Sequence, residues 1–239
     1  MGKGLGGNKS ESSYAITTDA SSNLYITGCF GSDSIIIGNV TLYNDFPPYD
    51  EYFVAKLDSN GNGIWAHKAC GVYQSWDMGN SIALDSLGNI YVAGQFHSDS
   101  ITFGNIVLHN MSNPVSNQIF IVKYDPSGNV LWAKKFGGNH SNIATGITID
   151  AFNNAYITGD FNCDSIHFDN FILHSHSGAN GNYFIAKLAP DGSVPLGKQS
   201  GWASPYIRQG NYDKRKFCLH HWRFHGRYHK IRKFHNSPA

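Results

Sequence analysis

One short segment of the chain carries oxygen-bearing side chains at alternate positions, a spacing that could bind calcium. Asp58, Asn60 and Asn62 match the first half of a calcium loop, which also needs the glycine found at its sixth position. The twelfth position, where such a loop supplies a bidentate glutamate, holds Ala69. The equivalent turns elsewhere in the chain lack the pattern, so we expect a hairpin turn here in preference to a calcium site.

Histidines form two further groups with metal-ligand spacing. His174 and His176 would place both rings on one face of a strand, which suits zinc, and His167 and Cys163 lie nearby in the sequence. A second group has the i, i+4, i+8 spacing of a helical face: His221, His225 and His229. No matching ligands occur in the other parts of the chain. We therefore expect no bound metal, and no cofactor.

Aspartates recur at two positions of the repeat, and such repeated carboxylates could bind cations or take part in catalysis. They form two sets, Asp19, Asp85 and Asp150, and Asp33, Asp99 and Asp164. A ring of carboxylates could bind cations, but acid–base catalysis needs carboxyl groups with unlike pKa values, whereas a structural device is copied with each repeat. We expect these side chains to bond turn amides. The chain also lacks a nucleophile elbow, a Walker loop and a dinucleotide fingerprint, so no catalytic residues are assigned.

Composition excludes several protein classes. The four cysteines are sparse and unpatterned, so a disulfide framework is not indicated and we expect incidental thiols: Cys29, Cys70, Cys163 and Cys218. No apolar run approaches the roughly 20 residues of a membrane span. Charged residues make up only 15% of the chain, which suits a wet surface rich in Asn, Ser, Gly and Tyr.

Three near-copies of one unit must position all these residues. The segment Leu24–Gly28 recurs as Ile90–Gly94 and as Ala155–Gly159, with glycines 66 and then 65 residues apart. Short β-branched and aromatic runs are bounded by Gly, Asn, Asp or Ser, which is typical of strands joined by tight turns. The sequence therefore predicts an all-β chain with about four or five antiparallel strands per unit, stacked so that each unit covers the next.

The second unit carries one ordered pattern in full. Its elements are Asp85, Gly88-Asn89, Tyr91, Gly94, Phe103-Gly104-Asn105, Phe120, Lys123, Gly128-Asn129 and Leu131-Trp132-Ala133-Lys134. The pattern resembles the SBBP β-propeller repeat of bacteria over roughly residues 1–200. The other units depart from it at Ser22, Ile37, Asn153, Asp169 and Pro195-Leu196. The resemblance implies a β-propeller in an exported or cell-surface bacterial protein, and it implies no catalytic residues.

The repeat sets the expected boundaries. The divisions are 1–11 as the end of a preceding blade, 12–73, 74–139 and 140–201 as three blades, and 202–239 as a tail. Three blades are fewer than the roughly four to eight of a closed propeller, so we expect an incomplete ring whose partners include the remaining blades of a longer polypeptide. We see no signal peptide ahead of the repeats.

The tail differs in charge from the rest. From Trp202 onward it holds nine Lys or Arg against one acid, a net charge of +8, whereas residues 1–201 carry −7. A basic tail invites a nucleic-acid interpretation. We prefer a repeat read in a shifted frame, because a one-base shift at His220–Arg223 can restore the Ile-Thr-Gly of the repeated strand. On this interpretation the tail is disordered and nucleic acid is not a partner.

Two residue types that recur at fixed positions of the repeat, a tryptophan and a lysine, have structural explanations. Trp65 and Trp132 occupy the same repeat position, where we expect them to pack between blades and not to serve as ligand platforms. Lys56, Lys123 and Lys187 end apolar strands. We expect their charge to keep the strand ends solvated.

Function is expected to lie in the loops that vary most between units. These loops occupy equivalent positions, so one rim would gather them as a recognition surface for a protein or glycan ligand. The candidate binding residues are Tyr49, Asp50, Asn113, Asn117, Asn180 and Asn182. We expect a non-enzymatic binding or adhesion scaffold. The alternative is the scaffold part of a propeller enzyme whose catalytic residues lie in other blades or in another domain.

Overall fold

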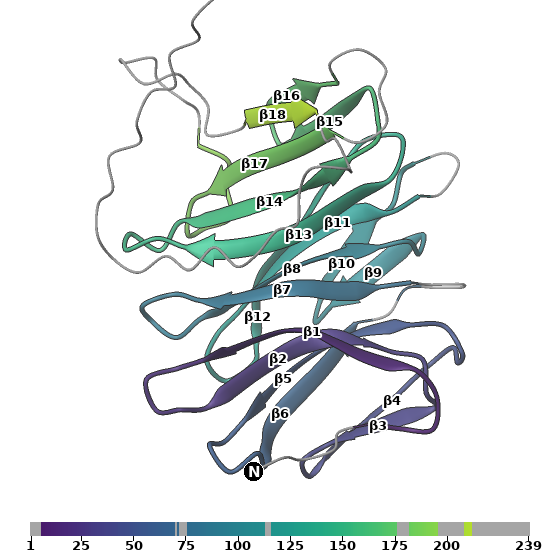
Figure 1. The fold of residues 1–239 in the computed structure, drawn as a ribbon, viewed down its shortest axis with the longest axis vertical. Coiled ribbons are helices and arrows are strands. Elements are labelled where there is room, and N and C mark those ends of the chain that lie inside the picture. Colours follow the sequence, from purple (N-terminus) through teal and green to yellow (C-terminus); the bar gives the residue numbers. More distant parts are fainter. Residues whose placement is uncertain are drawn as a thin grey trace, which may run out of the picture.

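The computed structural model describes residues 6–69, 71, 76–112, 116–175, 182–195 and 208–211, and every regular element in them is a β-strand. The strands form three four-stranded antiparallel sheets stacked in chain order, an open array without ring closure (Figure 1). The predicted all-β, propeller-like fold is therefore confirmed. None of the described residues belongs to a helix long and apolar enough to cross a membrane.

Each sheet pairs two hairpins side by side. The first sheet runs β1 (Glu11–Thr18), β2 (Leu24–Phe30), β5 (Glu51–Leu57) and β6 (Gly63–Ala69). The second runs β7 (Met78–Leu84), β8 (Ile90–Phe96), β11 (Gln118–Tyr124) and β12 (Val130–Phe136). The third runs β13 (Asn142–Ile149), β14 (Ala155–Phe161), β17 (Asn182–Leu188) and β18 (Arg208–Asn211).

The extra length of each unit is a separate two-stranded hairpin between the second and third strands of the sheet. These hairpins are β3 (Ser34–Ile37) with β4 (Val40–Tyr43), β9 (Ser100–Phe103) with β10 (Ile106–His109), and β15 (Ser165–Phe168) with β16 (Phe171–His174). A glycine shortly after the last strand of a sheet, which we call the outer strand, forms an isolated β-bridge with the hairpin of the following unit. Gly71 pairs in this way with Ile101, and Gly137 with His167. Gly6 makes the equivalent bridge to Ile36.

The turns between paired strands are held by aspartate. In the turn after β1, the Asp19 carboxylate accepts hydrogen bonds from the backbone N–H groups of Ser21 and Asn23 and from the Asn23 carboxamide, at 2.8–2.9 Å. Asp85 and Asp150 repeat this arrangement, so the expectation for this set is confirmed. Asn and Asp serve here because their side chains reach the amides two and four residues on.

The other set of aspartates behaves differently. The main-chain carbonyl of Asp33, and not its carboxylate, accepts the N–H of Asn44 at 2.9 Å, and Asp99 and Asp164 make the equivalent main-chain bonds. The Asp33 carboxylate instead contacts Lys9 at 2.8 Å. The prediction that its side chain bonds turn amides was therefore wrong, because the backbone already closes that turn.

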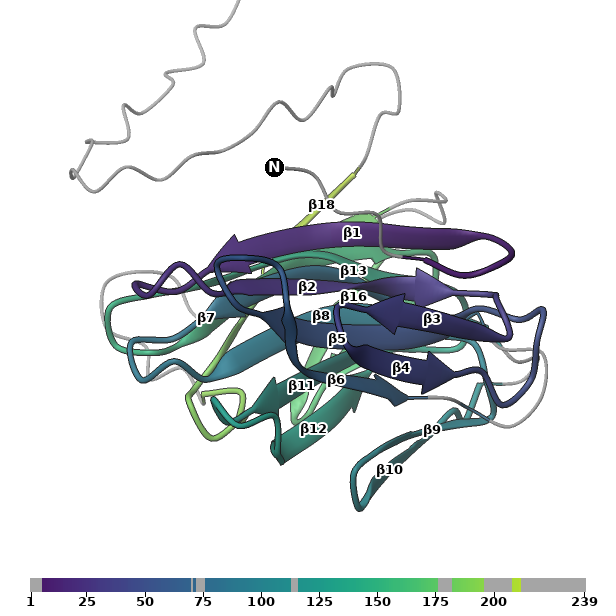
Figure 2. The same ribbon diagram turned by 90° about the horizontal axis from the view of Figure 1, so that it is seen from below.

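The first strands of the three sheets, β1, β7 and β13, which we call the inner strands, lie next to one another with β7 in the middle (Figures 1 and 2). Each has a β-bulge, at Tyr14, Asn80 and Thr145 respectively. Side chains of β7 join the second sheet to the third, because the Asn80 carboxamide donates to the Ala144 carbonyl at 2.9 Å and the Ser81 hydroxyl accepts the Ile147 N–H at 3.1 Å.

The core fills the spaces between sheets. Tyr52 and Val54 of the first sheet share one buried cluster with Phe103 of the β9–β10 hairpin and Phe120 of the second sheet. The same arrangement follows between the second and third sheets. As a result β11, in the middle sheet, is buried along its whole length, whereas β17 is buried on alternate residues only.

Tryptophan links consecutive sheets at the outer strands. The Trp65 indole donates to the Pro126 carbonyl at 3.3 Å, and Trp132 donates to the Pro190 carbonyl at 3.1 Å, each in the turn of the next sheet. The prediction that these rings pack between blades is confirmed. Lys123 does not keep a strand end solvated, because it is buried; the prediction was wrong there, since the next sheet covers that strand end.

The third sheet includes four residues of the predicted tail. Residues 208–211 form β18, which pairs with β17 from Asn182↔Asn211 to Ile185↔Arg208. The rest of the tail, together with the connection at 196–207, lies outside the described residues.

Candidate ligand-binding groove

The loops predicted to bind are themselves tied to the scaffold. In the first loop, the Asn44 carboxamide donates to the Tyr49 carbonyl at 2.8 Å, and Tyr49 is half-buried. The Asp50 carbonyl accepts the N–H of Asp77, at the start of the next inner strand, at 3.1 Å. Asn117 makes the equivalent bond to Asn142 at 2.8 Å. Asp50 and Asn117 therefore join consecutive sheets, and ligand binding by these loops stays a prediction.

Of the three remaining predicted site residues, the structure describes one, Asn182. Asn182 is 1% exposed, and its carboxamide donates to the Ser175 hydroxyl at 2.9 Å. Asn113 and Asn180 lie outside the described residues, so whether the three loops form one rim also stays a prediction.

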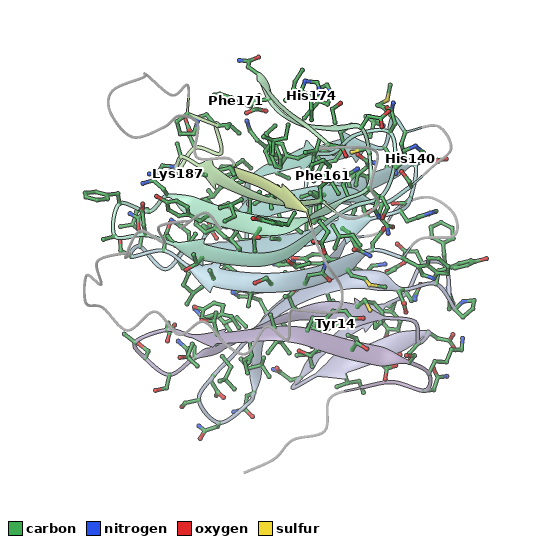
Figure 3. The ribbon with its side chains drawn as sticks, turned by 45° about the horizontal axis from the view of Figure 1, so that its top comes forward. Tyr14, His140, Phe161, Phe171, His174 and Lys187 are labelled. Carbon is green, nitrogen blue, oxygen red and sulfur yellow. The ribbon has the colours of Figure 1, made fainter. Side chains whose placement is uncertain are left out.

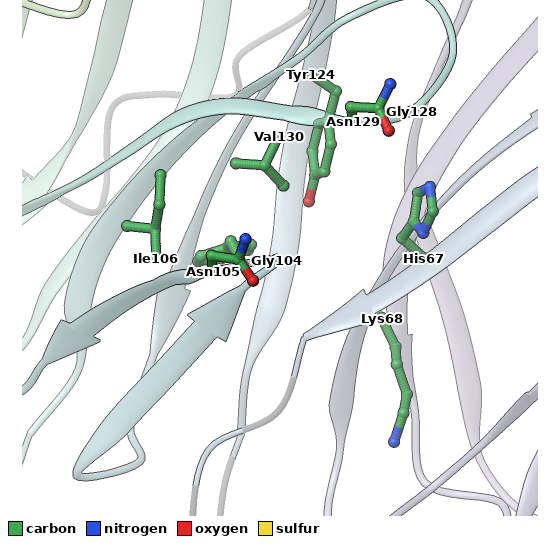
Figure 4. A pocket seen from close by; sticks show the side chains of 10 residues that line it. His67, Lys68, Gly104, Asn105, Ile106, Tyr124, Gly128, Asn129 and Val130 are labelled. Atoms are coloured by element: carbon green, nitrogen blue, oxygen red, sulfur yellow. The ribbon is translucent and has the colours of Figure 1, made fainter.

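A groove lies at the opposite strand ends, between the first and second sheets. It encloses about 480 Å³ between β6, which supplies His67 and Lys68, and two turns, one within the β9–β10 hairpin and one between β11 and β12. Figure 4 shows His67 across the opening from Asn105, with Tyr124 beside the β11–β12 turn. The walls thus come from one strand and two glycine-containing turns.

The groove is open because this junction lacks an ion pair that closes the next one. At the next junction the position of His67 is taken by Lys134 and that of Gly104 by Asp169, and their charged groups meet at 2.9 Å. The Asp169 carboxylate also accepts the Val194 N–H at 3.4 Å, which closes the gap further. Neither contact can form where the sequence has His67 and Gly104.

His67 is held in an aromatic stack. Its ring lies 5.2 Å from Trp65 at an angle of 29° and 6.3 Å from Tyr124 at 6°. A Cβ at Gly128 would lie 2.6 Å from His67 Nε2, and Gly128 has a φ of 90°, so the turn beside the ring requires glycine. Partial desolvation beside the neighbouring rings lowers the pKa of His67 below its ordinary 6.5, which leaves the imidazole uncharged at neutral pH.

The other polar groups at the groove are oriented by the scaffold. The Tyr124 hydroxyl shares a hydrogen bond with Tyr52 at 3.1 Å, and burial raises its pKa. The Lys68 ammonium lies 2.7 Å from Asp45 and 3.1 Å from Glu51. Its charge is therefore balanced, and the groove offers neutral donors and acceptors together with the edges of aromatic rings.

The metal-binding alternatives have structural explanations in the described part of the chain. Asp58 accepts from the N–H groups of Asn60 and Asn62 at 2.8–2.9 Å, which is the turn arrangement expected for it. No group of three or more His, Cys, Asp or Glu among the described residues could hold an ion. His167 lies 3.3 Å from the Ser165 hydroxyl, and His176 is outside the described residues.

The structure describes two of the four cysteines. Cys29 and Cys163 are free and buried. Cys70 and Cys218 lie outside the described residues.

The sequence contained a signal for the groove, but it was not used. His67 and Gly104 differ from Lys134 and Asp169 at aligned positions of otherwise similar units. Such a paired difference indicates that one junction has an ion pair and the other does not. Recognising it required knowing that the two positions meet across the sheets.

Comparisons with known proteins agree with the repeat architecture. The family model described as SBBP, β-propeller repeat, matches residues 73–95. An uncharacterized WD repeat-containing protein, L264 of Acanthamoeba polyphaga mimivirus, is 30% identical over 165 residues, which cover 65% of this chain and 12% of that protein. The chain thus matches only a small part of this relative.

A crystal structure of a protein of unknown function from Bacteroides caccae covers 89% of this chain and 85% of its own, at 8% identity and a TM-score of 0.25. The sheets and the sequence matches together support a β-propeller repeat scaffold, and they assign it no specific function.

Proposed function

We propose that this chain is a non-enzymatic binding segment of an exported or cell-surface protein, and that the groove beside His67 takes a short neutral saccharide. The observation that carries this proposal is the difference between the two sheet junctions, because His67 and Gly104 leave the first junction open where Lys134 and Asp169 form an ion pair across the next. A difference confined to one junction is what distinguishes a site from a repeated structural device.

The chemistry of the groove suits sugar hydroxyls. The uncharged His67 imidazole and the exposed Asn105 carboxamide can each donate and accept hydrogen bonds. The edges of the aromatic stack supply apolar surface for the C–H face of a sugar ring. The balanced charge of Lys68 gives no strong preference for an anion.

A binding role is favoured over catalysis by what lines the groove. Its lining contains His67 and Lys68 but no carboxylate, serine or cysteine. General acid–base or nucleophilic chemistry needs a second group within hydrogen-bond reach. The alternative, a propeller enzyme with its catalytic residues elsewhere, receives no support from this site. Export is included in this proposal because it is what the resemblance of the repeat to the SBBP family implies.

The experiment is a binding screen of the whole chain against an array of neutral oligosaccharides, followed by calorimetric titration of the best binder. The variant His67→Lys with Gly104→Asp recreates the ion pair of the next junction. Asp169 has a φ of 48° and Gly104 has 56°, so an aspartate fits the turn. We expect at least a tenfold weaker affinity from this variant.

The control is Ile172→Lys, which adds a charge at a 49% exposed position on another hairpin. It should bind as the wild type does. An array without any binder would refute the saccharide proposal, and unchanged binding by the double variant would refute the groove as its site. Tyr49 and the neighbouring rim loop are the place to look for a protein partner in that case.

A further inference from the structure

The Asp50 carboxylate differs from the carboxylates around it because it has no partner. Glu51, the next residue, is paired with Lys68 at 3.1 Å, and Asp77 accepts the Gly71 N–H at 3.1 Å. Asp50 is half-buried, and within the described part of the chain no cation or hydrogen-bond donor contacts its carboxylate. Taking a carboxylate out of water without replacing its lost hydrogen bonds is unfavourable. A cation supplied by another molecule would therefore stabilise this group.

The backbone holds Asp50 where the first sheet meets the second. Its main-chain carbonyl accepts the Asp77 N–H at 3.1 Å. Its carboxylate lies against Gly31, where an added Cβ would come within 3.0 Å of the Asp50 Oδ1. Burial raises the pKa of the Asp50 carboxyl above its ordinary 3.8, as expected for a group that has lost solvation. The carboxylate is thus kept at a defined place beside the end of β2.

A tyrosine lies at the same junction. Tyr14 occupies the β-bulge of β1, on the inner edge of the first sheet (Figure 3). Its hydroxyl is 3.8 Å from the Cys29 Sγ and 3.8 Å from the Met78 Sδ, which belongs to the second sheet. Cys29 lies between Tyr14 and Asp50, since burial and then the nearby Asp50 carboxylate raise the pKa of its thiol to about 11. A carboxylate, a tyrosine ring and a thioether therefore gather at this end of the junction.

The corresponding positions at the next junction are occupied by asparagines that bond across it. Asn117, at the position of Asp50, donates to the Ser141 hydroxyl at 3.3 Å. Asn80, at the position of Tyr14, donates to a main-chain carbonyl of β13 at 2.9 Å. Neither bond has an equivalent at the first junction. Asn80 has a sheet on either side and is still half-exposed, so the accessibility of this position does not depend on a missing neighbour.

An arginine side chain suits these groups better than other cations. Its guanidinium is planar, pairs with a carboxylate through two N–H groups and stacks on aromatic rings, so it can use both Asp50 and Tyr14. The Met78 thioether offers a polarisable apolar surface to the rest of the side chain. Residues 1–201 carry a net charge of −7, which attracts a basic ligand and repels an acidic one.

We propose that Asp50 and Tyr14 bind an arginine side chain of a protein partner. A protein is the source because Tyr14 is 48% exposed, which makes the site an open surface, whereas a small molecule needs a pocket that buries most of it. Arginine and tyrosine are also among the residues that contribute most to binding at protein interfaces. The site precedes β5 and the saccharide groove lies at the opposite strand ends, so the two are independent.

The test follows methionine methyl groups by NMR in the whole chain. Its three methionines are Met1, Met78 and Met111, so carbon-13 labelling of their methyl groups makes Met78 the reporter and Met111, which is 80% exposed, an internal reference. Titration with N-acetyl-arginine methylamide at neutral pH should shift the Met78 signal saturably and leave that of Met111 unchanged. The citrulline analogue, in which a neutral urea replaces the guanidinium, should leave both signals unchanged.

The variant Asp50→Asn introduces the residue that the second unit has at this position, so the loop accommodates it, and affinity for the arginine probe should fall at least tenfold. The matched control is Asp99→Asn, which removes the same charge at an exposed position and should bind as the wild type does. A Met78 signal that does not respond, equal responses to the two probes, or unchanged binding by Asp50→Asn would each overturn the proposal. The groove variant His67→Lys with Gly104→Asp should still bind the arginine probe, which separates this site from saccharide binding.

Discussion

The ammonium of Lys123 lies 3.3 Å from the carboxylate of Asp85, and these side chains are only 8% and 0% exposed. Lys123 also donates to the Pro190 carbonyl in the third sheet. A single cation thus connects the turn after β7 with the turn after β17. The pair is enclosed because the third sheet covers the strand end on which Lys123 lies.

Removing this cation should be costly. Lys123→Met keeps most of the side-chain volume but leaves the Asp85 carboxylate buried without its partner, so we expect a loss of about 3–5 kcal/mol in the free energy of unfolding. Equilibrium urea denaturation followed by tryptophan fluorescence measures it. Lys134→Met is the matched control, because its pair with Asp169 is 30% and 37% exposed and should contribute at most about 1 kcal/mol. Equal losses from both variants would contradict this account.

The inter-sheet tryptophan bond gives a second prediction. Trp132→Phe retains an aromatic ring but removes the indole donor that bonds Pro190 at 3.1 Å. We expect a loss of about 1–2 kcal/mol, from one hydrogen bond and some buried area, in the same denaturation experiment. Trp76→Phe should change stability by less than about 0.5 kcal/mol, since Trp76 is 55% exposed. A larger effect at Trp76 would count against the importance of the inter-sheet bond.

The parts of the fold that could be predicted from the sequence are those with local causes. The aspartate turns form within five residues, so Asp85 and Asn89 already contain the information for their hydrogen bonds. The alternation of apolar residues likewise fixes which side chains of a strand point to the same face. The spacing of the repeats then placed the strands in similar sheets.

The parts that could not be predicted depend on contacts between units. Whether Lys123 is buried depends on the third sheet, some 67 residues away along the chain. The groove depends on His67 and Gly104, which belong to different sheets. The separation of β3 and β4 from the first sheet was also missed, because strand propensity does not specify which strands pair.

Asp77 gives a pH-dependent prediction. It is 0% exposed and accepts hydrogen bonds from the N–H groups of Gly71 and His97 and from the Ser98 hydroxyl. Burial raises its pKa from 3.8 to about 7, against the opposing effect of these hydrogen bonds. Because the folded state holds the proton more tightly than the unfolded state, this contribution to stability is present below about pH 4 and is lost as the pH rises toward 7.

The variant Asp77→Asn tests that dependence. Asn142 stands at the equivalent position of the third sheet, where it accepts from Cys163 at 3.0 Å, so the scaffold accommodates asparagine. The unfolding free energy of the wild type should fall more steeply between pH 4 and 7 than that of the variant. The comparison removes the common contribution of the histidines. Parallel curves would mean that Asp77 is ionised throughout this range.

The Asp58 turn gives a prediction about calcium. Both carboxylate oxygens of Asp58 are occupied, one by the N–H groups of Asn60 and Asn62 and the other by the Asn62 carboxamide at 2.8 Å. Calcium would have to displace these donors, and the twelfth position offers it no carboxylate. We therefore expect the melting temperature to be the same in calcium and in a chelator. Asp58→Ala should lower the unfolding free energy by about 1–2 kcal/mol in either condition, because it removes the turn's acceptor. A calcium-dependent rise in the melting temperature that disappears in Asp58→Ala would instead establish a metal site at this turn.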